Sequence, residues 1–129
     1  MRPLRPQAGF TLVEVLMVVL IIGVLAAIGV PAYTSHSQGA HRANAQSFIV
    51  DCASKLERVY TQNASYSATI STLCPPPANI AQRYAFTLTT ASSGASYSLA
   101  GAPQGSQTGD KCGTIAIDNT GAKTPANCW

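Results

Sequence analysis

A chain of 129 residues is too short for two ordinary domains, and with 47% hydrophobic and only 10% charged residues it is apolar for a soluble one. These values favour one small domain joined to a membrane-seeking segment. The formal net charge is +3, but removing Arg2 and Arg5 from the eight basic residues leaves six against five acidic ones. That near balance excludes a strong electrostatic field for nucleic acid.

The chain opens with a basic segment, MRPLRPQAG, that runs directly into an apolar stretch from Phe10 to Val30. As a helix this stretch would be about 31 Å long, which matches the core of a bilayer. An ordinary signal peptide is disfavoured because no polar cleavage region follows the apolar core. Arg2 and Arg5 beside a single span predict that the N-terminus stays cytoplasmic and the rest is exported.

Glu14 is the one charge within the apolar stretch. A charge deep in hydrocarbon costs about 2.5 to 3.5 kcal/mol even on lenient insertion scales, so something should compensate for it. One interpretation places Glu14 near the interface, where its side chain reaches water. The other requires cleavage between Gly9 and Phe10, because the new α-amine of Phe10 is a cation that Glu14 of the same or a neighbouring subunit can meet.

The segment GFTLVEVLMVVLIIGVLAAIGVPAY resembles the N-terminal signature of type IV pilins and their minor-pilin and pseudopilin relatives. The resemblance rests on Gly9 before the cleavage point, Phe10 after it, Glu14, the apolar run, and the ending Pro31-x-Tyr33. It implies that a prepilin peptidase cleaves after Gly9 and methylates the amine of Phe10. It also implies that Glu14 helps to recruit the subunit to a growing filament.

The same resemblance implies a domain organisation and a set of partners. Residues 1–9 would be the prepilin leader, residues 10–33 the transmembrane and filament-core helix, and residues 34–129 the headpiece. The partners would be other pilin subunits, the prepilin peptidase, the inner-membrane assembly machinery and, before assembly, membrane lipid. The subunit would be a single-pass inner-membrane protein with a periplasmic headpiece, and afterwards part of an extracellular pilus on the cell surface.

Beyond Pro31 the pattern predicts an amphipathic helix that ends near Asn63. Its apolar residues recur at spacings of three and four: Ala45, Phe48, Ile49, Cys52, Leu56 and Val59. Joined to the span, this gives a helix of roughly fifty residues whose first half must bury itself in lipid or in neighbouring subunits. We expect a break in this helix at Gly23 and Pro31, because proline removes an amide donor and glycine is a weak helix former.

The rest of the headpiece reads as a loop followed by strands. Residues 64–83 show no period and contain three consecutive prolines, and strands are predicted at residues 84–89, 96–100 and 113–117. Laid on the amphipathic half of the helix, three or four antiparallel strands would bury a common core of Phe48, Leu56, Tyr84, Phe86, Leu88 and Leu99. The predicted class is therefore α+β, a long N-terminal helix packed on a small antiparallel sheet, as in the pilin fold.

All four cysteines follow the apolar stretch and so lie on one side of any membrane that it spans. Their even number predicts disulfides in an oxidising compartment, and their spacing does not suit zinc. We expect Cys52–Cys74, which would pin the loop to the helix, and Cys112–Cys128, which would tie down the C-terminal tail. A cross pairing of Cys52 with Cys128 remains open. The closing layout from Cys112 to Cys128 is similar to the C-terminal disulfide loop of minor pilins.

No catalytic constellation is present, so we expect neither an enzyme nor a cofactor or metal site. His36 and His41 are expected to be solvated residues of the helix. A minor or major pilus subunit is favoured. One alternative is a competence pilin that binds DNA, for which Arg83, Lys111 and Lys123 are the candidate contacts. The other is a type II secretion pseudopilin, whose usual calcium site would find a poor cage in Asp110 and Asp118.

Overall fold

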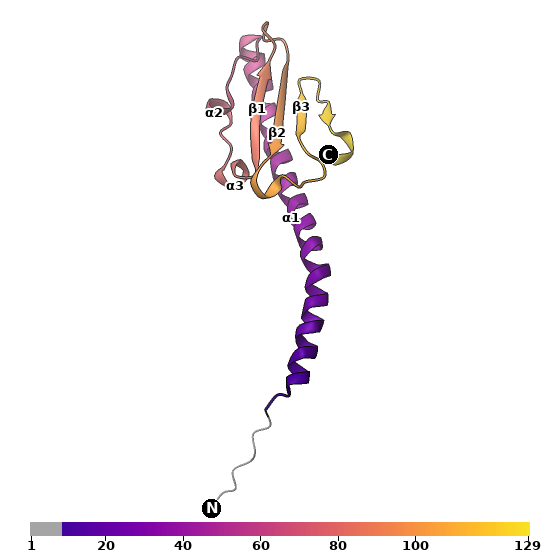
Figure 1. Ribbon diagram of the computed structural model, residues 1–129. Coiled ribbons are helices and arrows are strands. Elements are labelled where there is room, and N and C mark those ends of the chain that lie inside the picture. The colour runs from indigo at the N-terminus through magenta and orange to yellow at the C-terminus, as the bar shows by residue number, and fades with distance from the viewer. Residues whose placement is uncertain (1–8) are drawn as a thin grey trace, which may run out of the picture. The chain divides into compact units, whose positions relative to one another are not determined.

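A computed structural model describes residues 9–129 (Figure 1). The helices are α1 (Leu12–Asn63), α2 (Ile70–Leu73) and α3 (Ala78–Ala81), and the strands are β1 (Tyr84–Thr90), β2 (Tyr97–Pro103), β3 (Ile115–Asp118) and β4 (Lys123–Thr124). The chain divides into two compact units between Ser35 and His36, close to the expected boundary, and α1 contributes to both. The headpiece therefore begins at His36 in the structure.

Helix α1 has 52 residues and ends at Asn63, where the end of the amphipathic pattern was expected. It is helical throughout, with Gly23 and Pro31 inside it, so the break expected at these two residues is absent. Proline deletes only its own amide donor, and cooperative hydrogen bonding on both sides of it maintains the helix.

The sheet is a four-stranded antiparallel meander in the order β1-β2-β3-β4. Figure 1 shows α2 and α3 on the β1 side of the headpiece and the C-terminal segment on the β3 side. In the register, Leu88 lies opposite Leu99, and Leu99 lies opposite Ile117. These pairs place apolar residues of neighbouring strands on one face, as the alternating pattern requires.

The headpiece core lies between this face and the second half of α1. The buried face of the helix consists of Ala45, Phe48, Ile49, Cys52, Ala53 and Leu56. Tyr84, Leu99 and Ile115 of the sheet are fully buried with them, while Phe86 and Leu88 are partly buried against the cluster. The Phe48 and Phe86 rings, 4.5 Å apart between centroids, join helix and sheet. The expected core and the α+β class are thus confirmed.

Element bounds differ from expectation for backbone reasons. Strand β3 starts at Ile115 instead of residue 113, because Gly113 has φ of +58°, a left-handed conformation that a strand cannot contain. Strand β2 extends to Pro103, which lies opposite Tyr84 at the end of the ladder, where a missing amide donor is tolerated. The expected loop at residues 64–83 contains α2 and α3, single turns too short to show a period.

Candidate functional site

The N-terminal helix carries the residues that the sequence associates with assembly. Phe10 and Glu14 both line a shallow hollow of about 260 Å³ whose other walls are Val15, Val18 and Val19. The Glu14 amide donates to the Thr11 hydroxyl at 3.3 Å, so Thr11 satisfies a free donor at the start of the helix. The expected leader, residues 1–9, lies outside the described residues apart from Gly9.

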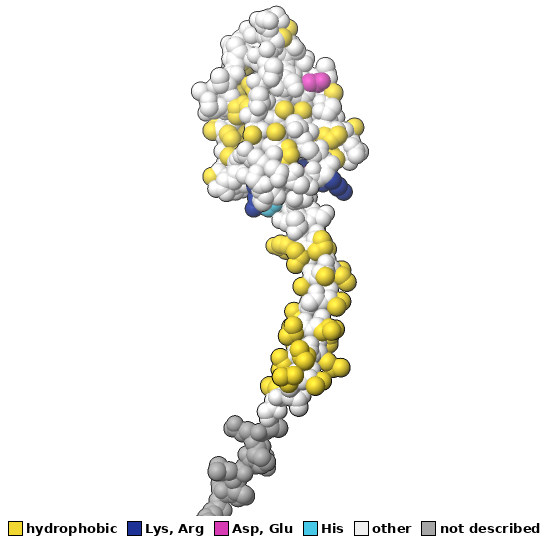
Figure 2. Space-filling model, in the orientation of Figure 1, with side chains coloured by type: hydrophobic (Ala, Val, Ile, Leu, Met, Phe, Trp, Pro, Cys, Tyr) yellow, Lys and Arg dark blue, Asp and Glu magenta, His cyan; other side chains and the backbone are white. Residues whose placement is uncertain are grey.

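The apolar residues of this helix have no partners within the described chain. From Phe10 to Val30, every large hydrophobic side chain is between 50% and 85% exposed. Figure 2 shows yellow side chains closely spaced along the first half of α1, whereas on the headpiece face in view they are scattered. The helix is long and apolar enough to cross a membrane, and none of its apolar window is buried. Such a surface requires lipid or other subunits.

The three candidate DNA contacts have different environments. Arg83 is half-buried just before β1 and donates to the Ser106 hydroxyl at 2.7 Å. Lys111 is exposed in the segment between β2 and β3. Lys123 lies over the Trp129 ring, 4.9 Å from its centroid. Since β1 and β4 are the two outer strands, Arg83 and Lys123 are separated by three strand spacings, about 14 Å. This separation favours contacts to different phosphates.

A buried polar network, which the sequence did not predict, connects α1 to the segment after β2. Asp110 pairs with Arg42 of α1 and accepts hydrogen bonds from the Tyr84 hydroxyl at 3.0 Å and the Gln107 amide at 2.7 Å. Gln107 also donates to the Gln38 carbonyl at 2.8 Å. Arg42 and Asp110 are 68 residues apart, so no local pattern could have paired them.

Two pKa values in this network are shifted. Burial alone would raise the pKa of Asp110, but hydrogen bonds from the Cys112 amide, Gln107 and Tyr84, together with the Arg42 charge, lower it. Burial, and secondarily the hydrogen bond to Asp110, raises the pKa of Tyr84 to about 12. The network is therefore an anionic carboxylate surrounded by neutral or positive donors, which holds the segment against the helix.

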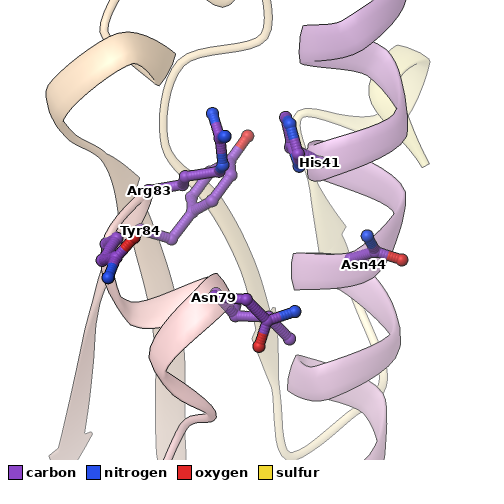
Figure 3. A pocket seen from close by; sticks show the side chains of 7 residues that line it. His41, Asn44, Asn79, Arg83 and Tyr84 are labelled. Carbon is purple, nitrogen blue, oxygen red and sulfur yellow. The ribbon is translucent and has the colours of Figure 1, made fainter.

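A cavity of about 170 Å³ lies between α1 and the segment that contains Arg83 and Tyr84 (Figure 3). It is lined by His41, Asn44, Asn79, Ile80, Gln82, Arg83 and Tyr84. Figure 3 shows His41 from α1 and Arg83 from the start of β1 on opposite sides of the opening. His41 is half-buried here, whereas the sequence predicted a solvated residue; His36 is exposed as expected.

The four cysteines and Asp118, also considered in the sequence, form bonds that stabilise the headpiece. Cysteines pair as Cys52–Cys74 and Cys112–Cys128, the arrangement expected from the sequence. Asp118 accepts hydrogen bonds from the amides of Thr120 and Ala122 and so closes the turn between β3 and β4. Within residues 9–129 no cluster of three potential ligand side chains could hold a metal ion.

Solved structures share this fold. A type IV pilin from Shewanella oneidensis superposes with a TM-score of 0.61 and 34% identity, covering 71% of this chain and 97% of that one. The Neisseria meningitidis non-core minor pilin PilV gives a TM-score of 0.57 over 70% of this chain and 87% of that one. At 17% identity, the second similarity shows the fold alone. The structure is thus of the type IV pilin class.

Family models identify the group within that class. Residues 4–30 match the prokaryotic N-terminal methylation motif. Residues 31–116, two thirds of the chain, match the model described as "Type IV minor pilin ComP, DNA uptake sequence receptor". The chain belongs to this family of type IV minor pilins.

Curated relatives are similar over a shorter stretch. Type II secretion system core protein G of Dickeya chrysanthemi is 38% identical over 65 residues, which is 50% of this chain and 42% of that protein. The chain therefore spans less than half the length of this relative.

Proposed function

We propose that this chain is a structural, non-enzymatic subunit of a type IV pilus, inserted through its N-terminal helix. The observation that carries the proposal is the exposed apolar surface from Phe10 to Val30, which coincides with the N-terminal methylation motif. Burying one such side chain contributes about 1.5 to 3 kcal/mol, so the helix partitions into lipid before assembly and into neighbouring helices afterwards. The headpiece, with a core of its own, stays outside that apolar environment.

In this proposal the inner membrane holds the precursor with its headpiece in the periplasm. The prepilin peptidase cleaves between Gly9 and Phe10 and methylates the Phe10 amine, and the assembly machinery then moves the subunit into an extracellular pilus. The uncompensated charge of Glu14 supports this order, because the amine released at Phe10 is a cation suited to it.

Intact-mass measurement of the chain in sheared pili tests this proposal. The expected mass is that of residues 10–129 plus one methyl group. A chain that keeps Met1, or one that begins beyond Ala27 as a conventional signal-peptidase product would, contradicts it. Absence of the chain from pili that contain other subunits also contradicts it.

A second candidate function is reception of DNA during uptake, and the family match over residues 31–116 favours it. Figure 2 shows Lys and Arg side chains at the lower edge of the headpiece face in view. We propose Arg83, Lys111 and Lys123 as contacts to separate phosphates along a duplex, in keeping with the distance between Arg83 and Lys123. Lys123 would contact its phosphate either from its position over the Trp129 ring or after moving away from that ring.

The salt dependence of duplex binding tests this second function. Three phosphate contacts predict that the logarithm of the binding constant falls with a slope of about −2.7 against the logarithm of salt concentration. Replacing one of the three cations by Gln should reduce that slope by about 0.9. Arg58→Gln, which removes an exposed helix cation, is the control. Equal losses for Arg58→Gln and the three variants would contradict a specific surface.

Type II secretion remains the alternative to a pilus, because the core protein G relative is similar to about half of this chain. The two roles differ in where the assembled subunit is found. Recovery in surface pili favours the pilus. A secretion defect in a deletion strain whose pili are normal favours the pseudopilin.

A further inference from the structure

We propose that the cavity lined by His41, Asn44, Asn79 and Arg83 is a binding site for a phosphate group. The inference concerns the headpiece alone and does not depend on whether the chain enters a pilus. It assigns a ligand class to a site distinct from the exposed lysines.

The lining is rich in hydrogen-bond donors that come from three separate segments. His41 and Asn44 lie on α1, Asn79 lies on α3, and Arg83 immediately precedes β1. In Figure 3 the His41 and Arg83 side chains flank the opening, with Asn79 and Asn44 below them. Only one of the five N–H donors of Arg83 is used in the recorded bond to Ser106, so its guanidinium keeps donors for a ligand.

The charge of the lining selects an anion. Among the residues that line the cavity there is no Asp or Glu, whereas Arg83 is permanently charged. The closest carboxylate in the hydrogen-bond network is Asp110, which is bonded to the Tyr84 hydroxyl and paired with Arg42. Within residues 9–129, the one carboxylate bonded to a residue of the lining is therefore already neutralised by the protein.

Size and geometry favour phosphate over larger or flatter anions. A volume of about 170 Å³ is below the 300 Å³ or more of drug-sized ligand sites, so the cavity suits a small group. A planar carboxylate needs only the fork of one arginine, but donors that converge from three segments suit a tetrahedral anion with oxygens in several directions. The amide oxygens of Asn44 and Asn79 can accept from hydroxyl groups of a phosphate ester.

Binding is measured by nitrogen-15 NMR on the full chain in detergent micelles. The probes are inorganic phosphate, a nucleoside monophosphate and a short DNA duplex, each titrated at constant ionic strength so that general screening does not change. We expect saturable shifts in the amides of Asn79, Gln82 and Arg83. Shifts with all three probes would identify nucleic-acid backbone as a source, and shifts with only the two small probes would identify free phosphate esters.

Three variants and two controls separate the cavity from net charge. Arg83→Gln and His41→Gln should each weaken phosphate binding, the former about tenfold because a charge-assisted hydrogen bond is lost. Asn44→Asp should weaken it at least as much, since it adds a carboxylate to the lining at an exposed helix position where the fold is not at risk. Ser54→Asp adds the same charge about 15 Å further along α1. Arg58→Gln removes an exposed cation elsewhere on α1, and both controls should bind as the parent does.

Two results would overturn the proposal. One is the absence of saturable shifts in these amides with either small phosphate. The other is equal weakening by Asn44→Asp and Ser54→Asp, which would reduce the effect to overall charge. Loss of phosphate binding in Asn44→Asp with DNA binding retained would instead support a cavity for free phosphate esters, and would leave the second candidate function in place.

Discussion

Asp110 is the polar residue on which the segment after β2 depends. It is 7% exposed and bonded to Arg42, Tyr84, Gln107 and the Cys112 amide. A buried carboxylate is tolerable only when its desolvation is offset by donors of this number and charge. The hydrogen bond that Asp110 accepts from the Cys112 amide also holds in place the cysteine that forms the C-terminal disulfide.

Asp110→Asn should lower the free energy of unfolding by about 3 kcal/mol, because it leaves the Arg42 charge unpaired and turns an acceptor into a donor. Thermal unfolding followed by circular dichroism measures the effect. Asp51→Asn is the matched control, since Asp51 forms an exposed pair with Lys55 at 2.9 Å and its loss should cost about 0.5 kcal/mol or less. Equal losses in the two variants would contradict a structural role of the network.

Tyr84 predicts an alkaline limit to headpiece stability. Its pKa is raised to about 12 in the folded chain, against about 10 when unfolded, so its contribution is fully present below pH 10 and is lost as pH rises through about 12. Burial, and secondarily the charge of Glu57, also raises the pKa of Tyr97 to about 12, so Tyr97 contributes over the same pH range. The melting temperature should fall as pH is raised from 9 to 12, and that of the Tyr84→Phe variant should fall less steeply. An identical pH profile for Tyr84→Phe would argue against this assignment.

The contribution of Asp110 to stability depends on pH in the opposite direction. Its pKa is lowered on folding, so its contribution is present above about pH 4, the ordinary range of an aspartate, and is lost as pH falls through the lower folded value. The Asp110→Asn variant should accordingly be the less pH-sensitive protein below pH 4.

At the scale of elements, helix and sheet meet closely at one glycine. Gly101 of β2 lies opposite Phe86 of β1, and a Cβ at this position would lie 3.0 Å from the Phe86 ring and 3.3 Å from Ile49 Cδ1. The space that a side chain would occupy is filled by the aromatic ring and the helix. This close approach explains why a glycine is found within a strand.

Gly101→Val should destabilise the headpiece by about 1 to 3 kcal/mol through overpacking, although valine favours strands. Thermal unfolding by circular dichroism again gives the measurement. Ala102→Val, on the exposed side of the same strand, is the control and should be close to neutral. A stable Gly101→Val variant would show that Phe86 and Ile49 can move aside.

Elements with a clear period were predictable and contacts between distant residues were not. The apolar spacing from Ala45 to Leu56 predicted the buried face of α1, and alternation predicted β1, because both signals lie within one element. The single turns α2 and α3 are too short for any period. The cavity and the Arg42–Asp110 pair depend on residues brought together by the finished fold, and a lone histidine such as His41 carries no local sign of its setting.

At the scale of the whole molecule, one helix contributes to two compact units whose stabilities have different sources. The headpiece has its own core and both disulfides. Residues 12–35 of α1 contain no buried residue, so their stable environment is supplied by lipid or neighbouring subunits. A change in the first part should therefore alter assembly and leave headpiece folding intact.

Glu14→Ala should leave the amount of membrane-bound subunit unchanged and sharply reduce its incorporation into pili, because the headpiece core does not involve residue 14. Immunoblots of membranes and sheared pili measure the two pools. Glu57→Ala, which removes an acceptor of the Tyr66 hydroxyl in the headpiece, is the control and should be incorporated normally if it folds. Normal incorporation of Glu14→Ala would refute the role of this carboxylate in assembly.

Trp129 is the only tryptophan of the chain, and it follows Cys128 directly. Its indole N–H donates to the Thr124 carbonyl at 3.1 Å, Lys123 lies against its ring, and Cys128 is bonded to Cys112. Intrinsic fluorescence excited at the indole band consequently reports on the C-terminal loop and on little else. Reducing agent added to the folded subunit should change this emission before the helical signal in circular dichroism changes. Fluorescence therefore follows release of the C-terminal loop, and circular dichroism follows unfolding of the headpiece.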